Sequence, residues 1–334
     1  PISITTQTGD LTISQNISTT DTSTSAVILN AGVSAAAGTA TGGNILITGP
    51  PSITVGTGGT IRLMSGSVSG STGLTALVGS GTGRFRYNSD ETTTNYTVAL
   101  SPNVVNAIYR EQPTANATID SYTVTYGFDH TLTLGSLKPN GTSPLSTSRT
   151  AVNGDDSVAG LGVLIEGATY STAGKLNYRV TPYTLTDGLS KLGYAMQQSG
   201  GSLLTVEKKA VNLVGFVVDN KVYDGNTAMG SYTLAPVGLV GADVVSLTGV
   251  GTYANKNVTG AADKTYTFTS LALGGADAAN YVLTDGTNPT TTYSGSNGEI
   301  TPRALTASFT GVNKVYDGVL AATVTTTDDR VAGD

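Results

Sequence analysis

Hydrophobic residues in the first third of the chain occur in short runs that are separated by Gly, Ser and Thr. A run of about four to six residues has the length of a strand, but one such strand cannot bury a core alone. Strands stacked coil on coil would bury one continuous apolar stripe, as in a solenoid. The pattern therefore predicts the end of a right-handed parallel β-helix over residues 1–110, and a β-sandwich of short hairpins is the alternative. The runs are LTIS (11–14), AVILNAG (26–32), NILITG (44–49), TIRLMSG (60–66) and LTALVG (74–79).

A more charged stretch at residues 80–111 interrupts these runs and ends with the dipeptide Arg110-Glu111. The last coil of a solenoid exposes backbone edges and apolar side chains, so a polar closing segment is expected there. We therefore interpret this stretch as a cap over the last coil, followed by a linker to the next domain.

Alternation of polar and apolar residues at strand period continues beyond the cap, divided by turns rich in Gly, Asp and Pro. GSLLTVEKKAV at 201–211 matches GSNGEITPRAL at 295–305, and NKVYDG at 220–225 recurs at 313–318. The repetition predicts modules of about 95 residues, built as small immunoglobulin-like β-sandwiches. The chain is therefore expected to be all-β. The expected domains after the β-helix are residues 111–208, residues 209–303 and the start of a further module at 304–334.

The repeated NKVYDG carries a strong turn signal. Gly225 accepts a positive φ that other residues resist, and Tyr223 can pack its ring on the core while its hydroxyl reaches the backbone. Lys221 and Asp224 lie three positions apart and can form a weak ion pair. We interpret the motif as a structural corner that fixes strand register. Its members are Lys221, Tyr223, Asp224 and Gly225, and in the second copy Lys314, Tyr316, Asp317 and Gly318.

A site with chemistry is the alternative interpretation of this corner. Asp219 and Asp224 are candidate calcium ligands, because Ca²⁺ takes oxygens from carboxylates and carbonyls, and Lys221 is a candidate for a covalent cross-link. Asp155-Asp156 is a second candidate calcium site, although a solvated turn is the simpler interpretation and neither stretch has the spacing of an EF-hand loop. A catalytic role is not expected, since catalysis rarely needs the same centre in every repeat.

Other candidate chemistry is sparse. Cysteine is absent, so disulfides and thiolate metal sites are excluded. His130 is the only histidine and could bind zinc only alongside carboxylates, but nothing near it has ligand spacing, so it is expected to face solvent from a strand. No pair of carboxylates stands out for acid–base catalysis. The chain is therefore expected not to be an enzyme and to hold no cofactor, with calcium as the one candidate ion.

Charge and hydropathy exclude two classes of partner. Charged residues make up 12% of the chain and the net charge is −6. Without a basic patch to neutralise phosphates, nucleic acid is not an expected partner. No apolar stretch has the length of a membrane span, so membrane insertion is not expected either.

The stretch ALTASFTGVNKVYDG at 304–318 resembles the YDG repeats of very large exoproteins of bacterial two-partner secretion systems, similar to filamentous haemagglutinin. YTVTYG at 122–127 and LLTVEKKAV at 203–211 resemble the related MBG-type module, but Tyr126-Gly127 has no Asp between its members. The resemblance implies a secreted adhesin at the bacterial cell surface, exported with an outer-membrane secretion partner. It supplies no catalytic residues.

The expected function is that of a structural and adhesive stalk segment in attachment, aggregation or biofilm matrix, with polysaccharide or cell-surface glycans as partners. One alternative is a carbohydrate-binding module in which exposed tyrosines such as Tyr183, Tyr232 or Tyr253 stack on sugars. Another is a self-assembling extracellular filament in which neighbouring copies pair. The chain begins at Pro1 instead of Met and ends inside a repeat, so we expect it to be a piece of a longer protein.

Overall fold

The computed structural model describes residues 1–128, 148–158, 160–213, 216–260 and 262–334. Strands dominate these residues, and the helical elements among them are one short α-helix and a few 3₁₀ turns. The predicted all-β class is therefore confirmed. No helix in the described ranges has the length and apolar character needed to cross a bilayer.

The chain divides into two compact units, each of which is described by itself. Unit 1 comprises residues 1–124, 128–169 and 179–206, and unit 2 comprises residues 125–127, 170–178 and 207–334. His130 lies outside the described residues.

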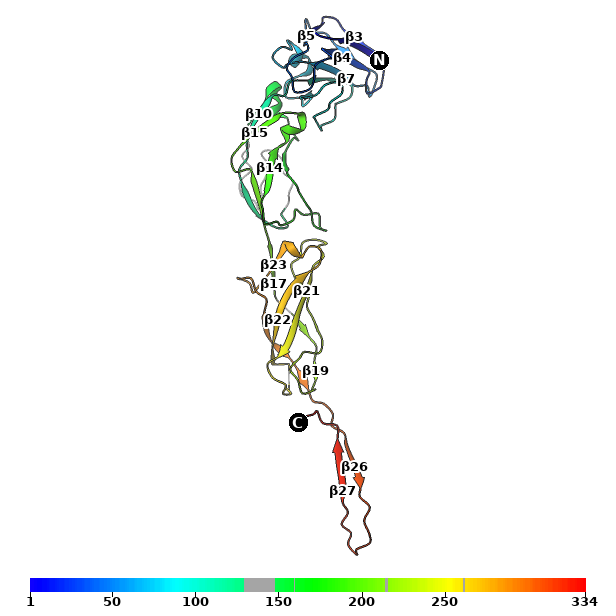
Figure 1. Cartoon of the computed structure of the whole chain (residues 1–334), viewed down its shortest axis with the longest axis vertical. Helices are drawn as coiled ribbons and strands as arrows, with labels where there is room; N and C mark the ends of the chain where they lie inside the picture. Colours follow the sequence, from blue (N-terminus) through cyan, green and yellow to red (C-terminus); the bar gives the residue numbers. More distant parts are fainter. Residues whose placement is uncertain (129–147, 159, 214–215, 261) are drawn as a thin grey trace. The chain divides into compact units, whose positions relative to one another are not determined.

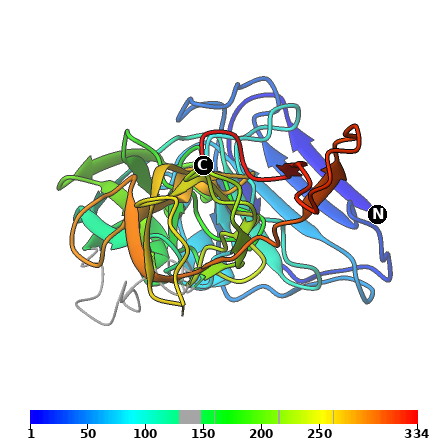
Figure 2. The same cartoon turned by 90° about the horizontal axis from the view of Figure 1, so that it is seen from below.

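Parallel strands build the first part of unit 1. In the largest sheet, β1 (Ile2–Thr6), β4 (Val27–Ala31), β7 (Ile61–Ser65) and β9 (Val105–Tyr109) run side by side in that order, and β8 (Phe85–Arg86) pairs with β9 (Figure 1, Figure 2). Two smaller parallel sheets pair β2 (Leu11–Ile13) with β5 (Ile45–Ile47), and β3 (Ile17–Ser18) with β6 (Ile53–Thr54). Leu29, Leu63 and Ala107 are partners in adjacent strands and are fully buried, so side chains of the same register stack into one core.

The hydrophobic runs do not all join the same sheet. The runs at 26–32 and 60–66 supply β4 and β7, whereas those at 11–14 and 44–49 supply β2 and β5. Strands of one sheet are therefore about twice as far apart in sequence as successive runs. LTALVG is not a strand, because it forms α1 (Leu74–Val78), in which Leu74 and Val78 are buried on one face at helical spacing.

The cap expected at 80–111 contains two arginines that are fully buried, Arg86 and Arg110. Arg110 donates to Asn30 Oδ1 at 3.1 Å, to the carbonyl oxygens of Thr41 at 3.2 Å and Gly43 at 3.0 Å, and to that of Ala31. Carbonyl oxygens at the end of β4 and just before β5 thus find donors in this stretch of the chain.

Two further sheets complete unit 1. β10 (Thr114–Thr118) pairs in parallel with β15 (Ala195–Ser199) and antiparallel with β12 (Arg149–Thr150). The other sheet has the order β11–β16–β14–β13. Its strands are β11 (Tyr122–Thr125), β16 (Leu203–Glu207), β14 (Tyr183–Asp187) and β13 (Val163–Ile165), and the 3₁₀ turns are η2 (Val152–Ser157) and η3 (Gly188–Leu192).

Unit 2 is centred on the antiparallel sheet of β21 (Ser246–Tyr253), β22 (Lys264–Gly274) and β24 (Tyr293–Gly298). Phe268 of β22 lies in its core with Phe216 and Tyr232 edge-on to its ring. Two other strand pairs are parallel: β17 (Lys209–Asn212) with β23 (Tyr281–Thr284), and β19 (Lys221–Val222) with β25 (Ile300–Thr301). Two more are antiparallel: β18 (Val217–Val218) with β20 (Tyr232–Thr233), and β26 (Ala307–Gly311) with β27 (Val324–Asp328). A 3₁₀ turn, η4 (Ala278–Asn280), precedes β23.

Candidate functional site

The repeated motif forms a corner around a buried ammonium group. Lys221 lies on β19, and its side chain is 6% exposed. Its Nζ lies 2.8 Å from Asp224 Oδ1 and donates to Asn226 Oδ1 at 2.8 Å, the Asn226 carbonyl oxygen at 3.1 Å and the Ala228 carbonyl oxygen at 2.5 Å. We call Lys221, Asp224, Asn226 and Ala228 the lysine corner. The charge is surrounded by acceptors, as a buried ammonium requires.

The turn inside the lysine corner is held by Asp224. Its carboxylate accepts from the Asn226 amide nitrogen at 3.1 Å and from Asn226 Nδ2 at 3.0 Å, while Gly225 takes the expected positive φ of 82°. Desolvation acts to raise the pKa of Asp224, but the hydrogen bonds from Lys221 and Asn226 outweigh it and lower that pKa. The predicted turn and the predicted Lys221–Asp224 pair are therefore confirmed.

The second copy of the motif repeats the central contact in a more open setting. Lys314 Nζ lies 2.8 Å from Asp317 Oδ1 and donates to the Val319 carbonyl oxygen at 2.8 Å. The hydrogen bond from Lys314 lowers the pKa of Asp317. Val319 stands where the first copy has Asn226, and the side chain of Lys314 is 39% exposed. The corner thus keeps its lysine–aspartate pair without the amide.

Tyr223 behaves differently from the prediction. Its hydroxyl donates to Asp334 Oδ1 at 2.7 Å, not to the backbone. The corresponding Tyr316 is 94% exposed. The motif tyrosine therefore binds a carboxylate in the first copy and is exposed in the second.

Unit 2 contains a second buried lysine, which the sequence pattern did not predict. Lys264 at the start of β22 donates from Nζ to Asn255 Oδ1 at 2.7 Å and to the Asn257 carbonyl oxygen at 2.5 Å. Its sequence signal is the Asn-rich turn ANKN, whose asparagines supply acceptors as Asn226 does at the lysine corner.

The candidate calcium ligands are not gathered in one place. Asp219 Oδ2 accepts from Ser231 Oγ at 2.8 Å, and Asp224 is engaged with Lys221. Asp156 is exposed, whereas Asp155 is buried. Across the described ranges, no group of three or more His, Cys, Asp or Glu side chains is placed to hold a metal ion.

Asp155 is the centre of a buried polar cluster in unit 1, which corrects its interpretation as part of a solvated turn. Its Oδ2 accepts from the hydroxyls of Tyr87 at 2.7 Å and Tyr194 at 2.9 Å, and Asn153 Nδ2 donates to the Tyr87 oxygen at 2.9 Å. Burial outweighs the two tyrosine hydrogen bonds and raises the pKa of Asp155 to about 6. We call these four residues the Asp155 cluster.

Two of the tyrosines considered for sugar stacking are not available to a ligand. Tyr183 and Tyr253 are buried, so the expectation that they are exposed is wrong. Tyr232 donates its hydroxyl to the Gly249 carbonyl oxygen at 2.8 Å and packs on Phe268. These three rings serve the core of their units because strand alternation turned them inward.

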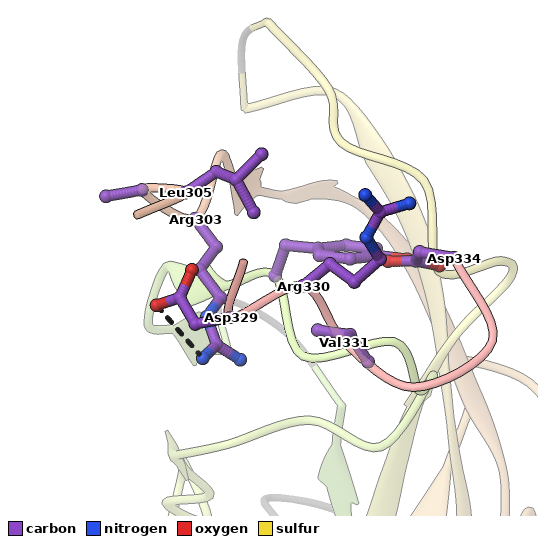
Figure 3. Close-up of a pocket in the computed structure, with 8 residues that line it drawn as sticks. Arg303, Leu305, Asp329, Arg330, Val331 and Asp334 are labelled. Atoms are coloured by element: carbon purple, nitrogen blue, oxygen red, sulfur yellow. Dashed lines mark hydrogen bonds and ion pairs between the residues drawn. The ribbon is translucent and has the colours of Figure 1, made fainter. Parts of the chain in front are cut away.

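A hollow of about 340 Å³ lies in unit 2, beside the motif tyrosine (Figure 3). Arg303 and Asp329 lie together on one side of it and form a 4.0 Å ion pair, and Val331 and Asp334 lie on its other side. The hollow is lined by Tyr223, Arg303, Ala304, Leu305, Asp329, Arg330, Val331 and Asp334. These side chains offer ion pairing and apolar contact, which suit the packing of protein segments more than acid–base chemistry.

Comparison with known proteins bears on the residues around the lysine corner. Residues 207–292 match the family model described as the YDG domain. Neither the curated proteins nor the solved structures gave a match. The matched range includes the lysine corner and most strands of unit 2. This chain therefore contains a YDG domain.

Proposed function

We propose that the chain is a non-enzymatic structural and adhesive segment of a large secreted bacterial surface protein, similar to filamentous haemagglutinin and exported by a two-partner system. In this proposal residues 1–110 are coils of a right-handed parallel β-helix. Residues 111–208 and 209–303 are small immunoglobulin-like β-sandwiches of the MBG and YDG types, and residues 304–334 begin another. No cofactor takes part, and the partners are surface glycans or polysaccharide.

The observation that carries the proposal is the repetition of the lysine corner. Lys221–Asp224 and Lys314–Asp317 have the same separation of 2.8 Å and the same place before a glycine turn. A group that recurs in both copies of the motif with its charge already paired serves the folding of the modules that contain it, whereas a catalytic centre would need one pocket and free groups. Parallel stacking of β1, β4, β7 and β9 supports the β-helix part.

Antibodies raised against the purified chain test the location and the role. They are expected to label intact cells of the source bacterium, and beads coated with the folded chain are expected to retain cells or polysaccharide. Beads coated with heat-denatured chain are the control. Labelling that needs permeabilised cells would overturn the secreted location, and equal retention by folded and denatured chain would overturn specific adhesion.

Self-assembly is a second candidate function, favoured by the β26–β27 hairpin. Both of its strands have one unpaired edge, and Phe309 and Leu320 are largely exposed. Open strand edges with exposed apolar side chains favour pairing with other chains. Light scattering over a concentration series distinguishes the two candidates: growth of polymers supports a filament subunit, and a constant monomer contradicts it.

A further inference from the structure

The tyrosine and glycine of the YDG motif contact a short loop that lies far along the chain. Tyr223 donates its hydroxyl to Asp334 Oδ1 at 2.7 Å. A methyl group on Gly225 would lie 2.6 Å from Val331 Cγ1, so the glycine leaves the space that the valine occupies. Lys256 Nζ adds a 3.0 Å ion pair to Asp334. The hydrogen bonds from Tyr223 and Lys256 lower the pKa of Asp334, which keeps it an acceptor.

The same contact is made at a second place in unit 2. Tyr126 donates its hydroxyl to Asp243 Oδ2 at 2.5 Å, and a methyl group on Gly127 would lie 2.8 Å from Val240 Cγ2. Tyr281 also donates to Asp243 Oδ2, at 2.6 Å. Burial and the hydrogen bond to Asp243 raise the pKa of Tyr126 to about 12, so its hydroxyl holds its proton at neutral pH.

The two loops that receive these contacts have the same sequence pattern and are closed by the same backbone hydrogen bond. One is Val240–Asp243 and the other is Val331–Asp334, both of the form Val-x-x-Asp. In each, the aspartate amide donates to the valine carbonyl oxygen at 3.1 Å. This hydrogen bond brings the valine and the aspartate of each loop close together, so a single tyrosine–glycine pair can meet both, although the glycine at positive φ is Gly241 in the second position of one turn and Gly333 in the third position of the other.

The glycines are suited to this contact in two ways. Gly127 and Gly225 have φ values of 94° and 82°, a conformation in which other residues are strained. A side chain at either position would also collide with the valine. The tyrosine side chain is long enough for its hydroxyl to reach the carboxylate beyond the valine.

We propose that the Tyr-Gly end of the motif, with or without an intervening Asp, is a docking surface for the Val-x-x-Asp loop of the next module in the chain. Two such pairs are seen, Tyr126–Gly127 with Val240–Asp243 and Tyr223–Gly225 with Val331–Asp334. The third surface, Tyr316–Gly318, takes the corresponding loop of a further YDG-type module. The inference rests on the structural part of the proposed function and is independent of adhesion to glycans.

The third surface has the features of the other two without an occupant. Gly318 has a φ of 75°, and a methyl group there would have no neighbour within 4 Å. Tyr316 is exposed, and both Val-x-x-Asp loops described above already have partners. The loop of another module of the family is therefore the occupant that the two filled pairs specify.

A double-mutant cycle in the full chain tests the filled pair. Tyr126→Phe, Asp243→Asn and the double variant are compared by amide hydrogen exchange of the loop at 240–243. Each single variant is expected to speed exchange about 10-fold, and the double variant no more than the worse single one, because one shared hydrogen bond is lost. Tyr232→Phe, which loses a hydrogen bond to a backbone carbonyl, is the matched control and should leave this loop unchanged. Additive effects, or no effect of Tyr126→Phe, would overturn the pairing.

The glycine contact has its own control. Gly286 has a φ of 102° and nothing within 4 Å of an added methyl group, so Gly286→Ala reports backbone strain alone. Gly127→Ala is expected to speed exchange of the loop at 240–243 at least 10-fold, and adding Val240→Ala should restore part of the protection. Equal behaviour of Gly127→Ala and Gly286→Ala, or no rescue, would contradict a role for the valine contact.

A longer chain tests the third surface. When residues 244–334 are appended after Asp334, they supply the rest of a module and a further Val-x-x-Asp loop, and Tyr316→Phe in the appended copy ensures that only the original Tyr316 is measured. Tyrosine-selective modification followed by mass spectrometry is expected to show Tyr316 protected about 10-fold relative to the 334-residue chain. Replacing Asp334 by Asn in the appended copy should restore its reactivity. Unchanged reactivity of Tyr316 in an extended chain whose Tyr223 stays protected would overturn the proposal, whatever the outcome of the adhesion experiment.

Discussion

Lys221 Nζ lies 2.8 Å from Asp224 Oδ1, and the lysine is almost entirely buried while the aspartate remains half exposed. The carboxylate is thus a minor partner in energy, because its charge is screened by solvent. The carbonyl oxygens of Asn226 and Ala228 and the Asn226 amide complete the shell. At this corner the chain folds around the ammonium group of Lys221.

Lys221→Met is therefore expected to destabilise unit 2 by about 2 kcal/mol, since it leaves several partly buried acceptors without their donor. Lys314→Met, at the more exposed copy, is expected to cost about 0.5 kcal/mol or less. Hydrogen exchange of β19 and β25 measures the first effect, and exchange of β26 and β27 measures the second. A cost at Lys314 as large as that at Lys221 would contradict the importance of burial.

The Asp155 cluster predicts a pH dependence of stability in unit 1. The pKa of Asp155 is raised to about 6 when folded, above its unfolded value, so the folded state holds the proton more firmly. Stability is expected to fall as pH rises from about 4 to about 6, by at most about 3 kcal/mol, and to level off above. Urea unfolding followed by tyrosine circular dichroism measures this. Asp155→Asn should remove most of this pH dependence of the free energy of unfolding. An unchanged pH dependence in that variant would mean that other titratable groups cause it.

The buried guanidinium of Arg110 predicts a large effect on the stability of the parallel sheets in unit 1. Its guanidinium is buried and donates only to uncharged oxygens, among them those of Asn30 and Gly43. Arg110→Met is expected to destabilise the parallel sheets by about 3 kcal/mol, because several carbonyl groups lose their donors. Arg330→Met is the control, since Arg330 is exposed and pairs with Asp328 on the surface. Hydrogen exchange of β4 and β7 that is unaffected by Arg110→Met would contradict this role.

Calcium is expected to leave the chain unchanged. Asp219 and Asp224 are engaged with Ser231 and Lys221, and no third carboxylate joins them among the described residues. The melting temperature should therefore be the same in Ca²⁺ and in chelator. A melting temperature that is higher in Ca²⁺ than in chelator, with no such difference in Asp219→Asn, would restore the calcium interpretation.

Local patterns predicted the strand content and the turns. Gly225 and Asp224 form the turn expected of them, because a glycine at positive φ and an Asx hydrogen bond involve neighbours in sequence alone. The prediction of a strand at LTALVG is wrong because short apolar runs suit a strand and a helix equally. Leu74 and Val78, which are buried at helical spacing, favour α1. Tyr183 and Tyr253 are buried, contrary to the prediction, because alternation does not say which face of a strand meets the core.

The sequence by itself determined the repeat, the all-β character, the turn at NKVYDG and its lysine–aspartate pair, since each depends on residues a few positions apart. Tertiary structure decided which strands share a sheet, why Asp155 and Arg110 are buried, and that Tyr126 meets Asp243, 117 positions away. The physical reason is that desolvation and long-range hydrogen bonding are set by partners that only folding brings together.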